Sequence, residues 1–500
     1  MVSGGQMLRR WSVYLLVFSS LAGSAWADTK SNPTQPRQKN AIAKLPITTS
    51  SAEARHSFEK AMREFEQYRI RETLQDLREA INADPNFGQA FILISRLSQD
   101  PAEQATTRKR AKQLAVKVSA SEQLLIRWLA NAQENNYLPA IAAMNTLLAK
   151  YPRDQRLAYL AGDWLIGQQQ YEQAIRVLER ALALYPDYAA ALNDVAYGYA
   201  DTGNFEKAFA AMDRYVALEP DQPNPRDSYG EILRMAGRLD AALEQYRMSI
   251  RIDPNFGSEL GVADTYALMG KELEAREEYD RAIVFAPSNA DKVQRELQSA
   301  LTWIRQNNRK QAERALTDAA RHAHNAGLGR LEAEAHLVLG MYEPDPKAAM
   351  TELQIAQDVL REEHEISASD RDEEQARILR VRATRLAEMQ DMDPAAKAVQ
   401  QLETMAGVSR SQAIQLCYQG AAGAVLAAQG KFTEAIPHLQ EGATDPEAMR
   451  LLWQAYTRTG AASEAQAIAS KLAALNLPTV EQALVVPQFR VSLVSQVGPP

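Results

Sequence analysis

The sequence predicts an all-α protein, an α-α superhelix in which antiparallel helix pairs stack into a solenoid. Three observations predict this fold class. Prolines recur at a nearly constant step, small residues return at two fixed positions of that step, and glycines recur near its middle. A constant period of this kind is typical of stacked units that bury a continuous core against their neighbours.

The prolines set the period. Pro152, Pro186, Pro220 and Pro254 are each separated by 34 residues, and Pro287 follows at 33. A proline cannot continue a helix, and it biases the residue before it toward extended geometry. Each proline therefore marks the boundary between one repeat and the next.

Two positions of the period hold small residues when the proline is counted as position 32. Position 8 is Gly162, Ala196, Gly230 and Ala263, and position 20 is Ala174, Ala208, Ala242 and Ala275. Small residues allow two helices to approach closely, while the larger residues at positions 11 and 24 form ridges that enter the partner's grooves at an axial distance of ~8 to 10 Å. Each repeat is therefore predicted to be an antiparallel helix pair.

Glycines mark the turn between the two helices of a pair. Gly203, Gly237 and Gly270 stand in this turn in three successive repeats, where a helix that ends favours a residue able to adopt positive φ. Prolines, small residues and glycines together resemble the tetratricopeptide repeat, most strongly over residues 121–287. The resemblance implies a right-handed superhelix whose concave face is built from the first helices of the pairs.

Residues 1–27 have the features of an export signal. Two arginines precede an apolar run from Trp11 to Ala22, and a small-x-small cleavage site ends at Ala27. We expect translation to start at Met1 or Met7 and the signal peptide to be cleaved after Ala27. The predicted location is exported, either periplasmic or secreted.

The rest of the chain divides into four parts. Residues 28–50 contain three prolines and no apolar stripe, which predicts a disordered linker. Residues 51–287 form the tetratricopeptide-like array, and its first repeat lacks the turn glycine. Residues 288–475 keep helical patterning without the fixed step, which predicts irregular repeats of the same kind. Residues 476–500 include the β-branched, apolar segment Val485 to Val494 and are expected to be an extended tail.

The net charge, the lengths of the apolar runs and the cysteine count argue against several classes of protein. The net charge is −7, and nucleic-acid binding requires clustered cations, so no nucleic-acid partner is expected. After the export signal, no apolar run approaches the ~20 residues that a membrane-spanning helix needs, so no integral membrane span is expected. The single cysteine, Cys417, excludes a disulfide within the chain.

The motifs that suggest catalysis or metal binding are incomplete. His364-Glu365 is not followed by the second histidine of a zinc-protease HExxH motif. His322 and His324 are two residues apart, which on a helix directs their side chains about 200° apart. We therefore expect no enzyme, no cofactor and no metal site.

The resemblance implies a binding groove along the first helices. Positions 2, 5, 9 and 12 of each first helix share one face because they are three or four residues apart. The candidate peptide-binding residues at these positions are Arg156, Tyr159, Asp163, Asn193, Tyr197, Asp227, Glu231, Arg234 and Asp264. This face carries more acids than bases, and carboxylates can hold backbone N–H groups and cationic side chains. We expect a protein or peptide partner that is polar or basic.

The carboxylate clamp with which some members of the family bind chaperone C-termini uses Lys and Asn at groove positions. Tyr159, Asp163 and Asp194 stand among those positions in this chain, so the resemblance does not imply that partner.

Three functions remain open. The first is an exported protein–protein interaction scaffold that binds a partner segment in the concave groove. The second is a ligand-sensing regulatory solenoid, with its site in the longer, irregular pairs between residues 292 and 405. The third is the substrate-recognition part of an envelope enzyme system.

Overall fold

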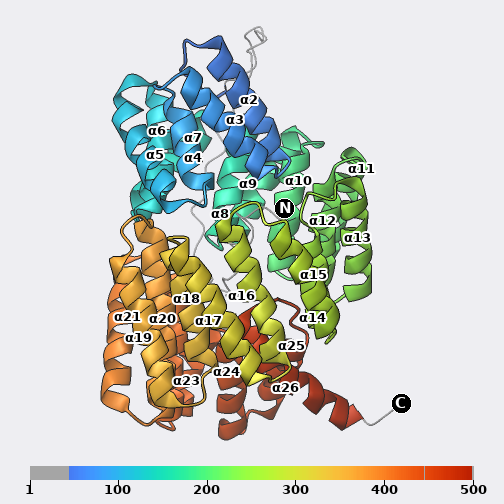
Figure 1. The fold of residues 1–500 in the computed structure, drawn as a ribbon, viewed down its shortest axis with the longest axis vertical. Helices are drawn as coiled ribbons and strands as arrows, with labels where there is room; N and C mark the ends of the chain where they lie inside the picture. Colours follow the sequence, from blue (N-terminus) through green and yellow to red (C-terminus); the bar gives the residue numbers. More distant parts are fainter. Residues whose placement is uncertain (1–43, 444, 498–500) are drawn as a thin grey trace, which may run out of the picture.

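The computed structural model describes residues 44–443 and 445–497, with side chains up to residue 490. All regular structure in these residues is helical, which confirms the predicted all-α fold (Figure 1). The expected signal peptide (1–27) and residues 28–43 of the expected linker lie outside the described residues.

Twelve antiparallel helix pairs follow one another in the described part of the chain. The seven pairs within residues 51–287 are α2 (Ala52–Glu66) with α3 (Ile70–Ala83), α4 (Gly88–Leu97) with α5 (Pro101–Leu114), α6 (Ala120–Gln133) with α7 (Tyr137–Lys150), α8 (Gln155–Gly167) with α9 (Tyr171–Leu184), α10 (Ala189–Asp201) with α11 (Phe205–Leu218), α12 (Pro223–Met235) with α13 (Leu239–Ile252), and α14 (Glu259–Leu268) with α15 (Glu272–Val284). A 3-10 turn, η1 (Ala115–Lys117), follows α5. The five pairs within residues 288–475 are α16 (Asn289–Arg305) with α17 (Arg309–Asn325), α18 (Gly329–Tyr342) with α19 (Pro346–Glu362), α20 (Ala368–Glu388) with α21 (Met392–Val408), α22 (Gln412–Ala428) with α23 (Phe432–Glu441), and α24 (Pro446–Thr459) with α25 (Ala462–Ala473).

Ten of the twelve turns inside the described pairs use left-handed backbone. Gly203, Gly237 and Gly270 have φ values of 78°, 76° and 75°, as the sequence predicts. The first pair has no glycine in its turn, and Tyr68 adopts φ 59° there instead. Left-handed geometry costs a residue with a side chain roughly 1–2 kcal/mol, so the packing of the pair imposes the turn even where the sequence does not favour it.

The small residue at position 8 makes room for the large residue at position 24 of the same pair. A Cβ atom on Gly162 would lie 2.5 Å from Leu178 Cδ2, and one on Gly230 would lie 3.0 Å from the Tyr246 ring. Leu178 and Tyr246 are both buried. The two helices of a pair therefore cross where one of them carries almost no side chain, as the periodicity predicts.

The first helices of the pairs line the inside of the superhelix and the second helices form its outside (Figure 1). In the fifth pair, α10 buries ten of its 13 residues, whereas α11 buries four of its 14. A helix buried on nearly all sides faces other protein elements all round. The inner face is thus the place where side chains from several repeats can meet.

The first superhelical turn closes on itself. Tyr68, in the turn between α2 and α3, donates a hydrogen bond to Asp194 on α10. Arg69 lies 3.2 Å from Gln222, before α12, and 3.4 Å from Asp253, after α13. The beginning of the solenoid therefore contacts pairs that follow it by more than 120 residues.

The second half of the chain packs against one end of the first turn. The Tyr137 hydroxyl, at the start of α7, lies 2.6 Å from Ser369 Oγ on α20. Ser409 Oγ donates to Asn135 Oδ1 at 3.3 Å. These bonds place the α20–α21 pair against the turn between α6 and α7.

The prediction of an extended C-terminal tail is wrong for most of residues 476–500. This part of the chain forms α26 (Val480–Val497). Val485, Val486 and Phe489 are buried in a cluster with residues of α24 and α25. β-Branched residues favour strands only weakly, and a neighbouring groove that buries one face of a helix outweighs that preference.

Candidate functional site

A non-helical segment, Lys44–Ser50, crosses the inner face of the first four pairs, and we name it the strap. The Leu45 N–H donates to Asp154 Oδ2 at 2.7 Å, and the Thr48 N–H donates to Glu122 Oε1 at 2.7 Å. The Thr48 hydroxyl also donates to Glu122. Two carboxylates of the solenoid therefore bind the backbone of a segment that has no secondary structure of its own.

Side-chain donors bind the carbonyl groups of the strap. Gln89 Nε2 donates to the Pro46 carbonyl at 2.5 Å, and Arg55 donates to the Ile47 carbonyl at 2.9 Å. The Thr49 hydroxyl donates to Asp84 at 2.6 Å. Donors and acceptors of the solenoid thus satisfy the backbone of the strap from both sides.

The expectation of a disordered linker over residues 28–50 is wrong for residues 44–50. The polar composition of the strap led to that prediction. A polar segment remains disordered when it cannot bury enough apolar surface to offset its loss of entropy. In this chain, hydrogen bonds to buried side chains of the pairs order the strap instead.

Glu122 is the centre of the strap contacts. It is fully buried at the start of α6, where it forms a capping box with Ser119. Burial acts to raise the pKa of Glu122, but hydrogen bonds from Thr48, Ser119 and Gln89 favour the charged form and lower the pKa overall. The site is built around a carboxylate that stays ionised while it binds backbone N–H groups.

The structure places the predicted groove residues on four successive inner helices, α8, α10, α12 and α14. Eight of the nine are buried: Tyr159, Asp163, Asn193, Tyr197, Asp227, Glu231, Arg234 and Asp264. The ninth, Arg156, is partly exposed and pairs with Glu59 and Glu66 of α2 at 2.9 Å each.

Residues from three repeats form a charged network on the inner face. Arg234 donates to Glu231 and to Asp264, each at 2.8 Å. The Tyr197 hydroxyl donates to Glu231 at 3.1 Å, and the Tyr279 hydroxyl donates to Asp264 at 2.5 Å. Burial acts to lower the pKa of Arg234, but the neighbouring tyrosines and Asp264 raise it overall. The arginine is held as a cation that links two repeats.

The other predicted residues are distributed between a second ion pair and an aromatic cluster. Asp163 pairs with Arg96 of α4. The Tyr159 ring packs against Phe65 at a centroid distance of 5.5 Å and against Tyr188 at 6.1 Å. Asn193 and Tyr197 lie one turn apart on α10, and the Tyr197 hydroxyl donates to Glu231.

Four inner-face residues that contact the strap or a predicted groove residue were not predicted from the sequence: Gln89, Arg96, Glu122 and Asp154. Counting the same register from Pro85 and Pro152 puts Gln89 and Glu122 at position 2 and Arg96 at position 9 of the second and third repeats. The repeat register therefore identifies these three residues, whereas the predicted groove begins only at Gln155. Asp154 caps the start of α8, where its side chain accepts a hydrogen bond from the Leu157 N–H at 3.1 Å.

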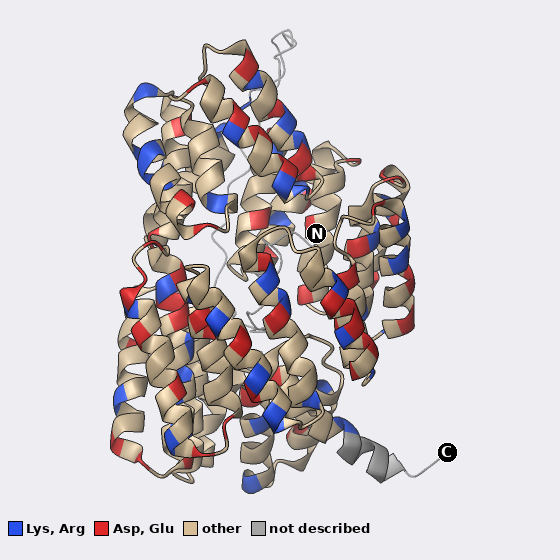
Figure 2. Ribbon diagram, viewed as in Figure 1, with Lys and Arg blue, Asp and Glu red and all other residues tan. Residues whose placement is uncertain are grey.

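Acids and bases alternate along the helices of both halves (Figure 2). Within the described residues, no group of three or more His, Cys, Asp and Glu side chains is arranged to hold a metal ion. Among the described helices, none is long and apolar enough to cross a membrane. What the inner face offers chemically is therefore ionised side chains that bind backbone and side-chain groups.

Comparison with known proteins shows which family of repeats matches this chain. A family model of the tetratricopeptide repeat matches residues 161–227, from α8 to the start of α12. This match falls on the pairs whose register, turns and crossing contacts are described above. The chain contains tetratricopeptide repeats.

Two curated relatives of this tetratricopeptide-repeat protein share short segments with it. Tetratricopeptide repeat protein 13 of Homo sapiens is 33% identical over 96 residues, which is 18% of this chain. The TPR repeat-containing thioredoxin TTL4 of Arabidopsis thaliana is 31% identical over 75 residues, which is 15% of this chain. The matched segment spans 11% of the length of each relative.

Solved tetratricopeptide-like structures align with lower identity. Yeast Tom70 covers 84% of this chain and 96% of its own length, with 14% identity and a TM-score of 0.41. Cut9–Hcn1 of the APC/C covers 80% of this chain and 76% of its own length, with 15% identity and a TM-score of 0.38. MamA covers 34% of this chain and 95% of its own length, with 19% identity and a TM-score of 0.28.

Proposed function

We propose that this protein is an exported scaffold that binds a non-helical segment of a protein partner on the inner face of its first superhelical turn. The observation that carries the proposal is the strap, whose backbone is bound by Glu122 and Asp154. Contacts of this kind use main-chain groups that every peptide has, so the same inner face can hold a segment from another protein. In this role the solenoid binds without catalysing a reaction.

The partner segment is polar or basic. Four of the six charged residues among the predicted groove residues are acids: Asp163, Asp227, Glu231 and Asp264. All four acids are buried, and salt screens buried charges much less than exposed ones. Binding through these acids should therefore depend only weakly on salt.

Export is proposed from the residues before the strap. If the signal peptide is removed after Ala27, the mature chain begins at Asp28 and retains the strap. N-terminal sequencing of native material tests this. A cytoplasmic protein that retains Trp11 would show that export is wrong.

Recovery of partners from envelope extract tests the groove. The variant is Asp227→Asn with Glu231→Gln, because neutral side chains of similar shape remove charge without placing a second cation beside Arg234. The matched control on the outer helices α11 and α13 is Glu206→Gln with Asp240→Asn, both of which are exposed.

The groove variant should recover less of the partner than wild type, and the outer-face control should recover as much as wild type. Added salt should change recovery by wild type only slightly, because the acids are buried. Equal recovery by the three proteins, with all three melting at the same temperature, would show that the partner does not bind through Asp227 and Glu231.

A further inference from the structure

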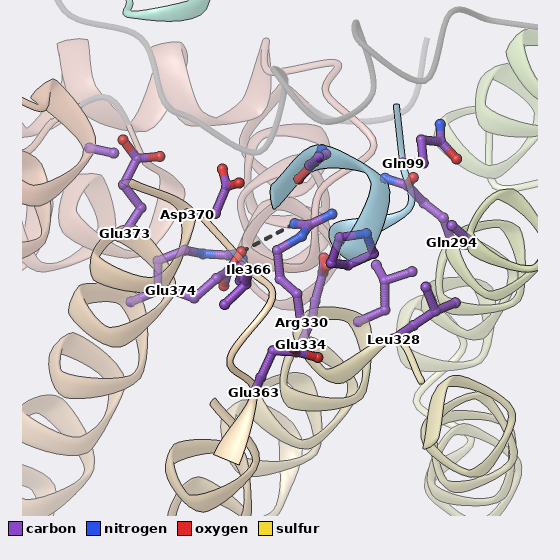
Figure 3. A pocket seen from close by; sticks show the side chains of 16 residues that line it. Gln99, Gln294, Leu328, Arg330, Glu334, Glu363, Ile366, Asp370, Glu373 and Glu374 are labelled. Carbon is purple, nitrogen blue, oxygen red and sulfur yellow. Dashed lines mark hydrogen bonds and ion pairs between the residues drawn. The ribbon is translucent and has the colours of Figure 1, made fainter. Parts of the chain in front are cut away.

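A second polar site lies where the two halves of the solenoid meet (Figure 3). A cavity of about 140 Å³ is enclosed by α18, α20, α16 and the connection between α4 and α5. It is formed by the irregular pairs together with one edge of the regular array. None of the nine groove residues lines it.

The cavity has a strong excess of acids. Five carboxyl groups line it, from Glu334, Glu363, Asp370, Glu373 and Glu374, against two guanidinium groups, from Arg330 and Arg377. Both arginines contact the same acid, since Arg330 lies 3.4 Å and Arg377 lies 3.1 Å from Glu374. Both arginines also act to lower the pKa of Glu334, which burial raises overall, and two guanidinium groups can offset the charge of only two of the five acids.

Two buried side chains at the cavity have unused hydrogen-bonding groups. Glu334, on α18, is 3% exposed, and Gln294, on α16, is 7% exposed. Neither makes a hydrogen bond to any residue that the structure describes. Neither contributes a fully buried atom that lacks a partner, so their polar atoms keep access to the cavity, and a ligand that supplies hydrogen-bond donors can reach them.

We propose that this cavity binds a compact organic cation, an ammonium or guanidinium group, with Glu334 as its principal acceptor and the Gln294 carbonyl as a second. A cation fits because carboxyl groups outnumber guanidinium groups by three, and a bound cation would favour the charged forms of Glu334 and Glu373, whose pKa values burial raises. An engineered cavity of about 150 Å³ holds benzene, so about 140 Å³ accommodates a planar guanidinium or a short alkylammonium. A metal ion fits poorly, because no described group of three ligating side chains converges there.

The same chemistry has two sources, a free amine or guanidine compound and the Lys or Arg side chain of another protein. The site is independent of the inner-face binding proposed above. A solenoid that bound a small cation where its two halves meet would couple the ligand to the contact between those halves.

Calorimetry on the full chain tests the site, with methylguanidinium chloride and butylammonium chloride as probes and acetamide as a neutral control of similar size. Potassium chloride at equal concentration controls for ionic strength. The test variant is Glu334→Gln, and the matched control is Glu362→Gln, an exposed acid at the end of α19.

Wild type and Glu362→Gln should bind at least one of the two cations equally, and Glu334→Gln should weaken that binding at least about tenfold, because a hydrogen bond to a charged group contributes about 1.5–3 kcal/mol. Acetamide and potassium should not compete. Burial raises the pKa of Glu334, so an amide replaces a carboxyl group that is costly to ionise. The melting temperature of each variant distinguishes lost binding from unfolding. Gln294→Leu should also weaken binding, because it removes the second acceptor.

A tripeptide Gly-Arg-Gly separates the two sources. Binding of the tripeptide would indicate a side-chain site open to a partner, and binding of methylguanidinium alone would indicate a site for a free compound. No binding to wild type, or equal binding by Glu334→Gln, would overturn the proposal. The Asp227→Asn, Glu231→Gln variant should bind the probes normally, so failure of the groove and failure of this site are distinguishable.

Discussion

Gly162→Ala should destabilise the solenoid because the added methyl group has no room. The new Cβ would lie 2.5 Å from Leu178 Cδ2 and 2.6 Å from Leu178 Cγ, well inside van der Waals contact. Overpacking of a core in this way costs about 1–3 kcal/mol. Alanine is favoured over glycine in a helix interior by about 1 kcal/mol, so we expect a net loss of about 1 kcal/mol in the free energy of unfolding.

Gly407→Ala is the matched control. Gly407 lies in α21, and no atom lies within 4 Å of the position that a Cβ would take there, so alanine should be neutral or stabilising. A compensating variant imitates the next pair, where Ala196 and Met212 hold positions 8 and 24. Adding Leu178→Met to Gly162→Ala should restore stability, because methionine adapts to irregular space.

Urea unfolding followed by circular dichroism compares five proteins: wild type, Gly162→Ala, Leu178→Met, the double variant and Gly407→Ala. A long repeat array departs from two-state behaviour, so the comparison uses the transition midpoint, with hydrogen exchange in α8 and α9 to locate the effect. Gly162→Ala and Leu178→Met, which lie in the same helix pair, should show a coupling energy of about 1 kcal/mol. Equal midpoints for the Gly162 and Gly407 variants, or additive effects of the paired substitutions, would refute the reasoning from packing.

Three further predictions follow from other sites. Burial raises the pKa of Glu373 to about 7 from 4.5. The native state therefore binds the proton of this carboxyl group more tightly than the unfolded chain does. The stability that this proton contributes is lost as pH rises from about 4.5 through about 7. Glu373→Gln should flatten that loss in thermal unfolding measured across this range. Gln390→Gly should raise the urea midpoint, by about 1 kcal/mol in stability, because Gln390 has φ 61°; an unchanged midpoint would contradict this. Thr48→Val removes a hydroxyl that binds Glu122 and should speed amide exchange in the strap, whereas Thr146→Val on the exposed face of α7 should leave it unchanged.

The register of the helix pairs could be predicted because it depends on residues close in sequence. Gly162 and Leu178, which cross in the fourth pair, are 16 residues apart, and the turn glycine lies between the equivalent positions in the next three pairs. The turn between α2 and α3 could not be predicted from local residues, since Tyr68 adopts positive φ there and no glycine marks the position in the sequence.

The candidate site was predicted only in part. The periodicity placed Tyr197, Glu231 and Asp264 on one face, and the structure brings the last two together through Arg234. The strap was missed, because its order comes from Glu122 and other acceptors that lie far from it along the chain.

The sequence by itself determined the fold class, the length of each repeat and the residues that face inward, because a helix pair is specified by spacings within 34 residues. Only the tertiary structure decided which residues meet across repeats, such as Tyr68 with Asp194. It also decided that the strap and α26 pack on the solenoid. Finally, it brought residues as far apart in sequence as Gln99 and Ala413 to the wall of one cavity. The physical reason is that contacts between superhelical turns depend on the small rotation from each pair to the next. That rotation accumulates over many repeats and has no signature in any one of them.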